Sequence, residues 1–116
     1  MLVHRMFVHT KVFVKQWESL GYNDDDLAKL QKAICDNPHG HPVIRGTGGV
    51  RKTRFALEGR GKSGGVRIIY ADFPMHGIVY LLDAYPKSEK EDISNEERQL
   101  LKTAMNIADK NWRNRR

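Results

Sequence analysis

The sequence predicts an α+β domain in which two amino-terminal helices and one carboxy-terminal helix pack against a small antiparallel meander sheet. Apolar residues recur every three or four positions near both ends of the chain, which is typical of amphipathic helices. From residue 50 to residue 84 the period changes to two, which is typical of strands. A chain of 116 residues has room for one modest core, so we expect a single domain over residues 1–116 with the element order βααβββα.

The amino-terminal elements are expected to be a short strand and two helices. The strand is expected at His4 to His9, and the first helix begins near Thr10 and ends at Gly21. Asn23 is a good N-cap for a second helix, which the pair Asn37-Pro38 stops. Apolar residues at helical spacing mark the buried faces of the two helices: Phe13, Trp17 and Leu20, then Leu27, Leu30 and Ile34.

The middle of the chain predicts three consecutive strands. Their expected ranges are Val50 to Leu57, Val66 to Phe73 and Ile78 to Ala84. The glycine-rich segment GRGKSGG joins the first two strands, and a turn from Pro74 to Gly77 joins the last two. A final helix follows, because the S-x-x-E pattern at residues 94–97 is that of a capping box.

Positive charge is concentrated in one glycine-rich segment, residues 45–67. This segment holds seven basic residues and one acidic residue, an excess equal to the net charge of +6 of the whole chain. Charge gathered against its own repulsion indicates a polyanionic partner. A composition of 40% apolar and 29% charged residues excludes a disordered tail. The apolar runs are too short to span a membrane and there is one cysteine, so we expect a cytoplasmic protein without a membrane partner.

Strand alternation brings three of these cations to one face of the predicted sheet. In a strand, alternate residues share a face. Lys52 and Arg54 therefore point away from Phe55, which belongs in the core. On the next strand, Arg67 points away from the apolar Ile68. The two strands thus display Lys52, Arg54 and Arg67 together, although an ordinary solvated face of a sheet has the same pattern.

Two other motifs have simpler explanations. The segment ALEGRGKS matches the loose phosphate-loop pattern, but that pattern requires a helix after the loop, and here the strand-like GGVRIIY follows. The segment from Asn37 to His41 carries two imidazoles without a cysteine or acid pair to complete a zinc site. We therefore expect neither a nucleotide site nor a metal site.

Together these pieces resemble the RelE/ParE superfamily of toxins from bacterial type II toxin–antitoxin modules. The run NPHGHPVIRGTGGVRKTRFALEGRGKSGGVRIIY, followed by VYLLDAYPKSEKEDIS, carries the resemblance, which covers nearly the whole chain. The signatures GTGG-x-RK-x-R and GKSGG-x-R-x-I-Y are most similar to the HigB-type branch. The resemblance implies a RelE-like fold and a ribosome-dependent endoribonuclease, an mRNA interferase, that inhibits translation and needs no metal or other cofactor. It also implies partners: mRNA, 16S ribosomal RNA and a cognate antitoxin, expected to carry a helix-turn-helix domain.

The resemblance further implies roles for individual residues. In such enzymes the adjacent 2′-hydroxyl attacks the phosphodiester, so one proton is removed, the extra charge is stabilised and the leaving oxygen is protonated. Lys52 is the candidate general base, and Arg54 and Arg67 are the candidates for stabilising the charge. Lys87 lies where the family supplies a further basic or general-acid group, but relatives place a tyrosine or histidine in this tail, where the chain has Ile93. The expected RNA contacts are Arg51, Arg60, Lys62 and Tyr85, the last by stacking on a base or donating a proton.

Two other functions stay open at this point. A ParE-like inhibitor of DNA gyrase shares the fold but binds a protein target and has no need of a catalytic cation cluster. A non-catalytic basic RNA-binding module would keep the charge without the chemistry. The presence of Lys52, Arg54 and Arg67 together favours the endoribonuclease over both alternatives.

Overall fold

Helices and strands follow one another in the predicted order in the computed structural model, which describes residues 4–56, 65–87, 89 and 93–114. The elements are β1 (Met6–His9), α1 (Lys11–Ser19), α2 (Asp24–Asp36), β2 (Arg51–Phe55), β3 (Val66–Phe73), β4 (Ile78–Pro86) and α3 (Asn95–Arg113). The α+β class and the order βααβββα are therefore confirmed. The range of β3 agrees with the prediction, while β4 continues past Ala84 to Pro86.

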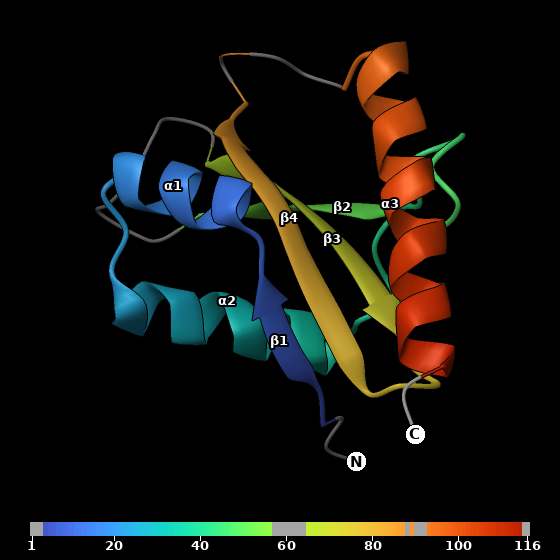
Figure 1. Ribbon diagram of the computed structural model, residues 1–116. Helices are drawn as coiled ribbons and strands as arrows, with labels where there is room; N and C mark the ends of the chain where they lie inside the picture. The colour runs from blue at the N-terminus through green and yellow to red at the C-terminus, as the bar shows by residue number, and fades with distance from the viewer. Residues whose placement is uncertain (1–3, 57–64, 88, 90–92, 115–116) are drawn as a thin grey trace.

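The described strands form a sheet in the order β1-β4-β3-β2, so that β1 and β2 are its edges (Figure 1). β2, β3 and β4 pair antiparallel, as predicted for a meander. β1 instead pairs parallel with β4, from Met6 opposite Ile78 to His9 opposite Leu81. The sheet is therefore mixed: the predicted antiparallel meander of β2, β3 and β4 is extended by one parallel strand. The reason is that α1 and α2 carry the chain across one face of the sheet before β2 begins, which leaves β1 to pair with the open edge of β4.

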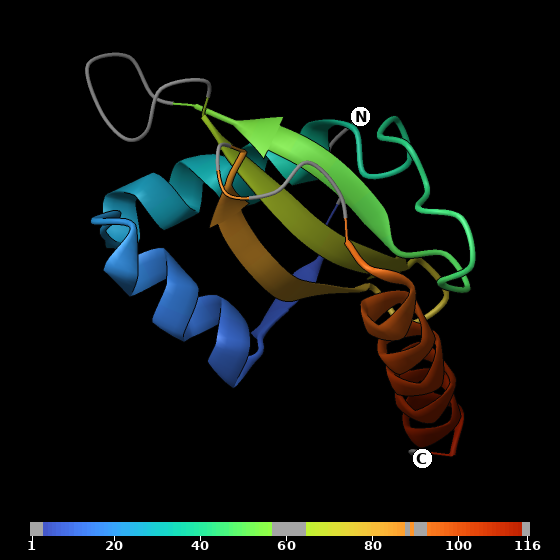
Figure 2. The same cartoon turned by 90° about the horizontal axis from the view of Figure 1, so that it is seen from above.

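The two faces of the sheet carry different helices (Figure 2). α1 and α2 cover one face, and α3 lies against the other. The larger core cluster, on the α1 and α2 side, includes Phe13, Trp17, Leu30, Ile34, Phe55, Ile68, Tyr70, Val79 and Leu81. The smaller cluster, on the α3 side, consists of Ile44, Val50, Ile69, Tyr85 and Ile93. Most of the apolar burial thus lies on the side away from α3.

Each helix begins where the sequence predicts, because its cap residue satisfies the first backbone donors. Thr10, Asn23 and Ser94 each accept a hydrogen bond from the backbone N–H three residues further on. At Asn23 and Ser94 an acidic side chain also accepts from the N–H of the cap residue, which completes a capping box. These bonds satisfy donors that a helix end leaves unpaired, and so they set the starts of α1, α2 and α3.

α3 is attached to the sheet less tightly than α1 and α2. None of its described residues is fully buried. Leu101 and Met105 are half-buried against the smaller cluster, whereas Leu100 is 70% exposed. Near its end, Asp109 pairs with His76 of the turn before β4, with 3.4 Å between Oδ1 and Nε2. No helix in the described part of the chain has the length and apolar character needed to span a membrane.

Candidate functional site

Arg54 on β2 and Arg67 on β3 occupy directly opposite positions in the sheet. Arg67 in turn lies opposite Tyr85 on β4, so the three residues form one row across three strands. Side chains at opposite positions share a face, with Cβ atoms about 4.5–5.5 Å apart. Phe55 and Ile68, which adjoin the two arginines in sequence, are buried on the α1 and α2 side. The row of arginines therefore belongs to the α3 side of the sheet.

Lys52 extends this arrangement along β2. It shares a face with Arg54, because alternate residues of a strand point the same way. Its opposite residue on β3 is Ile69, a member of the smaller cluster on the α3 side. The Lys52 side chain is half-buried, and Arg54 is exposed. The structure thus brings Lys52, Arg54 and Arg67 together on one face, which we call the cationic face.

The guanidinium group of Arg67 has unmet hydrogen-bonding capacity. Its Nε is buried and has no hydrogen-bond partner among the described residues. Buried polar groups in folded proteins are almost always paired, and a like charge directly opposite is destabilising. Both costs fall when an anion with several acceptor oxygens binds between Arg54 and Arg67. The arrangement therefore suits a phosphate group.

Lys87 and Tyr85 come from the end of β4. Lys87 follows Pro86, the last residue of the strand, and is half-buried. Since Pro86 lies opposite Val66, Lys87 is at the same end of the sheet as Arg67. Tyr85 is only 2% exposed, because its ring packs in the smaller cluster. A ring without an accessible face does not stack on a nucleobase, so this arrangement argues against stacking by Tyr85. Proton donation by its hydroxyl stays a prediction.

Arg51 lies on the face opposite to Lys52, in contrast to the role expected for it. One of its terminal nitrogens donates to the backbone oxygens of His39, at 3.1 Å, and His41, at 2.7 Å. The Arg51 guanidinium group is bonded to two backbone carbonyls and lies on the face away from Lys52 and Arg54. This placement argues against the phosphate contact expected for Arg51. The signal that predicts this placement was in the sequence, because adjacent residues of a strand always point to opposite faces.

The loop between β2 and β3 lies largely outside the described residues. The expected RNA contacts Arg60 and Lys62 belong to the undescribed part, so their positions stay predictions. The element after the loop is the strand β3, not the helix that a phosphate-binding loop requires. This supports the interpretation of ALEGRGKS as a chance match.

The histidine-containing segment before β2 makes structural contacts. The side chain of Asp72, 1% exposed, lies 2.6 Å from Arg5 Nε and 2.6 Å from His39 Nε2. Its hydrogen bond to Arg5 is the main cause of the raised pKa of that guanidinium group. No group of three possible metal ligands occurs in the described ranges. Sequence reasoning missed this cluster, because its members are far apart along the chain and pair only in the folded sheet.

The model of a protein family described as the RelE toxin of the RelE/RelB toxin–antitoxin system matches residues 4–114. The chain belongs to the RelE toxin family. A solved structure of the E. coli toxin RelE, with two arginines replaced by alanine and in the free state, has a similar fold. Its TM-score is 0.52 at 16% identity, and the match covers 78% of this chain and 90% of that chain. The protein is thus a toxin of a toxin–antitoxin module, in a family whose toxins are translation-inhibiting endonucleases. Its place in the HigB-type branch stays a prediction.

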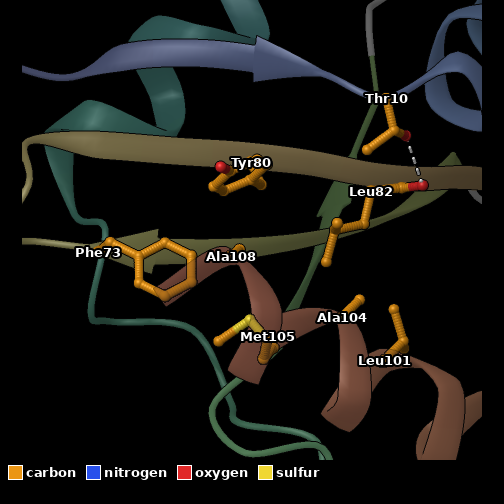
Figure 3. A pocket seen from close by; sticks show the side chains of 8 residues that line it. All are labelled: Thr10, Phe73, Tyr80, Leu82, Leu101, Ala104, Met105 and Ala108. Atoms are coloured by element: carbon orange, nitrogen blue, oxygen red, sulfur yellow. Dashed lines mark hydrogen bonds between the residues drawn. The ribbon is translucent and has the colours of Figure 1, made fainter. Parts of the chain in front are cut away.

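Membership in the RelE toxin family implies a cognate antitoxin as a partner. An apolar groove of the toxin runs between β4 and α3 and consists of two adjoining hollows. The first, of about 150 Å³, is lined by Thr10, Phe73, Tyr80, Leu82, Leu101, Ala104, Met105 and Ala108 (Figure 3). The second, of about 240 Å³, shares Leu82 and Leu101 with the first and reaches Val12 on α1 and Leu100 on α3. Its lining is mostly apolar and also includes the acidic residues Asp83 and Glu97. The groove also reaches Ile69, the residue opposite Lys52, and so adjoins the cationic face.

Proposed function

We propose that the toxin cleaves mRNA at the cationic face by attack of the adjacent 2′-hydroxyl on the phosphodiester, without a metal ion. The observation that carries this proposal is the direct opposition of Arg54 and Arg67, with Lys52 on the same face. Two guanidinium groups held by the sheet bind the phosphate and stabilise the charge that develops on the phosphorane. The amine of Lys52 supplies a group that exchanges a proton with a reacting oxygen.

The proposed roles follow from the positions of the four basic residues. Lys52, in its uncharged form, takes the proton from the 2′-hydroxyl. Arg67, on the inner strand β3, stabilises the phosphorane, and Arg54, exposed on the edge strand β2, clamps the phosphate. Lys87, at the end of β4, protonates the leaving 5′ oxygen.

The ribosome, in the cytoplasm, is the proposed place of cleavage. The basic excess within residues 45–67 suits a surface of ribosomal RNA as well as the message itself. Arg60 and Lys62 are proposed to bind phosphates of 16S ribosomal RNA or mRNA. Arg51 is left out of this set, because its guanidinium group is engaged with backbone carbonyls.

The proposed antitoxin has a helix-turn-helix domain and an amphipathic segment that packs in the apolar groove. An apolar helix face suits a groove lined by Leu82, Leu101 and Met105. Because the groove reaches Ile69, a segment seated there lies beside Lys52. The antitoxin then blocks the cationic face by occupying the space next to it.

Induction of the toxin in cells, followed by mapping of mRNA 5′ ends, tests the proposed activity. We expect new 5′ ends within translated messages, and none with Arg67→Ala. Lys110→Ala, at an exposed position on α3, is the matched control and is expected to cleave like the wild type. Intact messages with arrested replication would instead identify a ParE-like gyrase inhibitor. Intact messages with normal growth would identify a non-catalytic RNA-binding module.

A further inference from the structure

The segment of residues 38–50 lies against the beginning of the edge strand β2, on its outer side. The backbone N–H of Lys52 donates to the carbonyl of Pro42 at 3.0 Å. Val43 forms an antiparallel bridge with Arg51. The segment therefore pairs with the beginning of the strand that carries the proposed general base, and one of its bonds is made to Lys52 itself.

The sheet fastens the first part of this segment from the face opposite to Lys52. Arg51 donates to the carbonyls of His39 and His41, at 3.1 and 2.7 Å. Tyr70, directly opposite Arg51 on β3, is fully buried and donates its hydroxyl to the carbonyl of Pro38 at 2.8 Å. Two side chains of the sheet thus hold three backbone carbonyls of the segment.

Thr47 closes the far end of the segment. Its side chain is fully buried, and its hydroxyl donates to the carbonyl of Ile44 at 2.6 Å and accepts from the N–H of Val50 at 3.0 Å. The flanking residues Gly46 and Gly48 have φ values of 81° and 78°, in the left-handed region that favours glycine. The Thr47 hydroxyl therefore ties together the turn that returns the chain to β2.

We propose that residues 38–50 form a brace that holds Lys52 in place for proton transfer, with Arg51 and Thr47 as positioning residues. The inference rests on the proposed function, since it assigns a purpose to the position of Lys52. A residue on an unsupported edge strand moves with the local opening of that strand. Displacement of a reacting group by about 1 Å costs on the order of 10²-fold in rate. The brace restricts this motion by bonding the backbone of Lys52 to Pro42.

The variant Arg51→Ala distinguishes a role of Arg51 in the brace from a role in binding phosphate. Single-turnover cleavage is measured on ribosomes carrying mRNA, and ribosome binding is measured over a range of salt concentrations. We expect the cleavage rate at saturation to fall roughly 10-fold or more, with ribosome affinity and its salt dependence unchanged. Weaker binding with a shallower salt dependence would overturn the proposal, because it would show that Arg51 contacts phosphate. A wild-type cleavage rate would overturn it as well.

Thr47 offers a second test without a change of charge. Thr47→Val removes both hydrogen bonds at similar volume, whereas Thr47→Ser keeps the hydroxyl. We expect Thr47→Val to cleave roughly 10-fold more slowly and Thr47→Ser to cleave nearly as fast as the wild type. Equal rates for the two variants would refute the positioning role. Thermal unfolding establishes that each variant is folded under the assay conditions.

Hydrogen exchange at the Lys52 amide distinguishes failure of the brace from failure of the proposed function. In Arg51→Ala and Thr47→Val this amide is expected to exchange faster than in the wild type, because its bond to Pro42 opens more often. Unchanged protection would refute the brace whatever the enzymatic result. A wild-type toxin that cleaves no RNA would instead refute the proposed function and, with it, the purpose assigned to the brace.

Discussion

Lys52 lies directly opposite Ile69, and Ile69 lines the apolar groove. The proposed general base and the proposed antitoxin site are therefore neighbours on one face of the sheet. We expect a segment seated in the groove to exclude RNA from Lys52 without having to contact Arg54 or Arg67. If both proposals hold, we expect antitoxin binding to depend mainly on apolar contacts and to respond less to salt than RNA binding by the cationic face.

Leu100→Lys tests the groove as the antitoxin site. Leu100 lines the second hollow and is 70% exposed, so a lysine there places charge in the groove at little cost to the fold. We expect antitoxin affinity, measured by calorimetry, to fall roughly 10-fold or more, which corresponds to about 1.4 kcal/mol. Met75→Lys is the matched control, because Met75 is 91% exposed and does not line the groove. Equal affinities for the two variants would place the antitoxin elsewhere.

Arg67→Met is expected to remove activity without loss of stability. The substitution keeps the aliphatic stem and removes a guanidinium group that lies opposite Arg54 and has an unpaired buried Nε. We expect cleavage to fall about 10²–10³-fold, as for the loss of one group that stabilises developing charge. The free energy of unfolding in urea should stay constant or rise by up to about 1 kcal/mol. A clear loss of stability would show that Arg67 holds the fold rather than the phosphate.

The variant Lys52→Arg tests whether Lys52 acts by proton transfer or only by its positive charge. An arginine keeps the positive charge but stays protonated at any working pH, so it does not act as a base. We expect ribosome affinity to be retained and the single-turnover cleavage rate to fall about 10²–10⁴-fold. If the variant cleaved at the wild-type rate, Lys52 would serve only as a fixed cation.

Stability at alkaline pH is expected to depend on Tyr70. Burial is the largest cause that raises the pKa of its phenol, to about 12, compared with the usual value of about 10. As the pH rises past about 10 the unfolded chain releases this proton first. The stabilisation is therefore complete below pH 10 and is lost progressively up to pH 12, by about 2–3 kcal/mol.

Urea unfolding of the wild type and Tyr70→Phe between pH 8 and pH 11 checks this expectation. At pH 8 the variant should be less stable by about 1 kcal/mol, because the hydrogen bond to the Pro38 carbonyl is lost. The difference should shrink and then reverse as the pH increases. Parallel pH profiles for the two proteins would contradict the raised pKa.

Features governed by local interactions were predictable from the sequence. The helix starts at Thr10, Asn23 and Ser94 depend on bonds within one turn, and the structure has them. Alternation also placed Lys52, Arg54 and Arg67 on one face, because an apolar neighbour on each strand fixes the inward direction. The family resemblance then suggested the phosphodiester as the proposed substrate.

Features that depend on distant pairing were not predictable in the same way. The parallel pairing of β1 with β4 needs the path of α1 and α2, which no local pattern specifies. Tyr85 is buried because Ile93, in the segment leading to α3, packs against the same cluster, and the sequence alone does not say where that segment docks. In the sequence Arg51 is one more cation in a basic segment, whereas in the fold its guanidinium group donates to the carbonyls of His39 and His41.

The pairing of β1 with β4 determines when the sheet can be completed during synthesis of the toxin. The first strand of the chain meets its partner only at Ile78 to Leu81, and Phe13 and Trp17 share a core cluster with Val79 and Leu81. During synthesis, at about 5–20 residues per second, the amino-terminal segments therefore wait for β4 to leave the ribosome. Before β4 has left the ribosome, the chain has no completed sheet to hold the strands that carry Lys52, Arg54 and Arg67. The cationic face is therefore completed only after β4 has been synthesised, beside the ribosome on which we propose that the toxin acts.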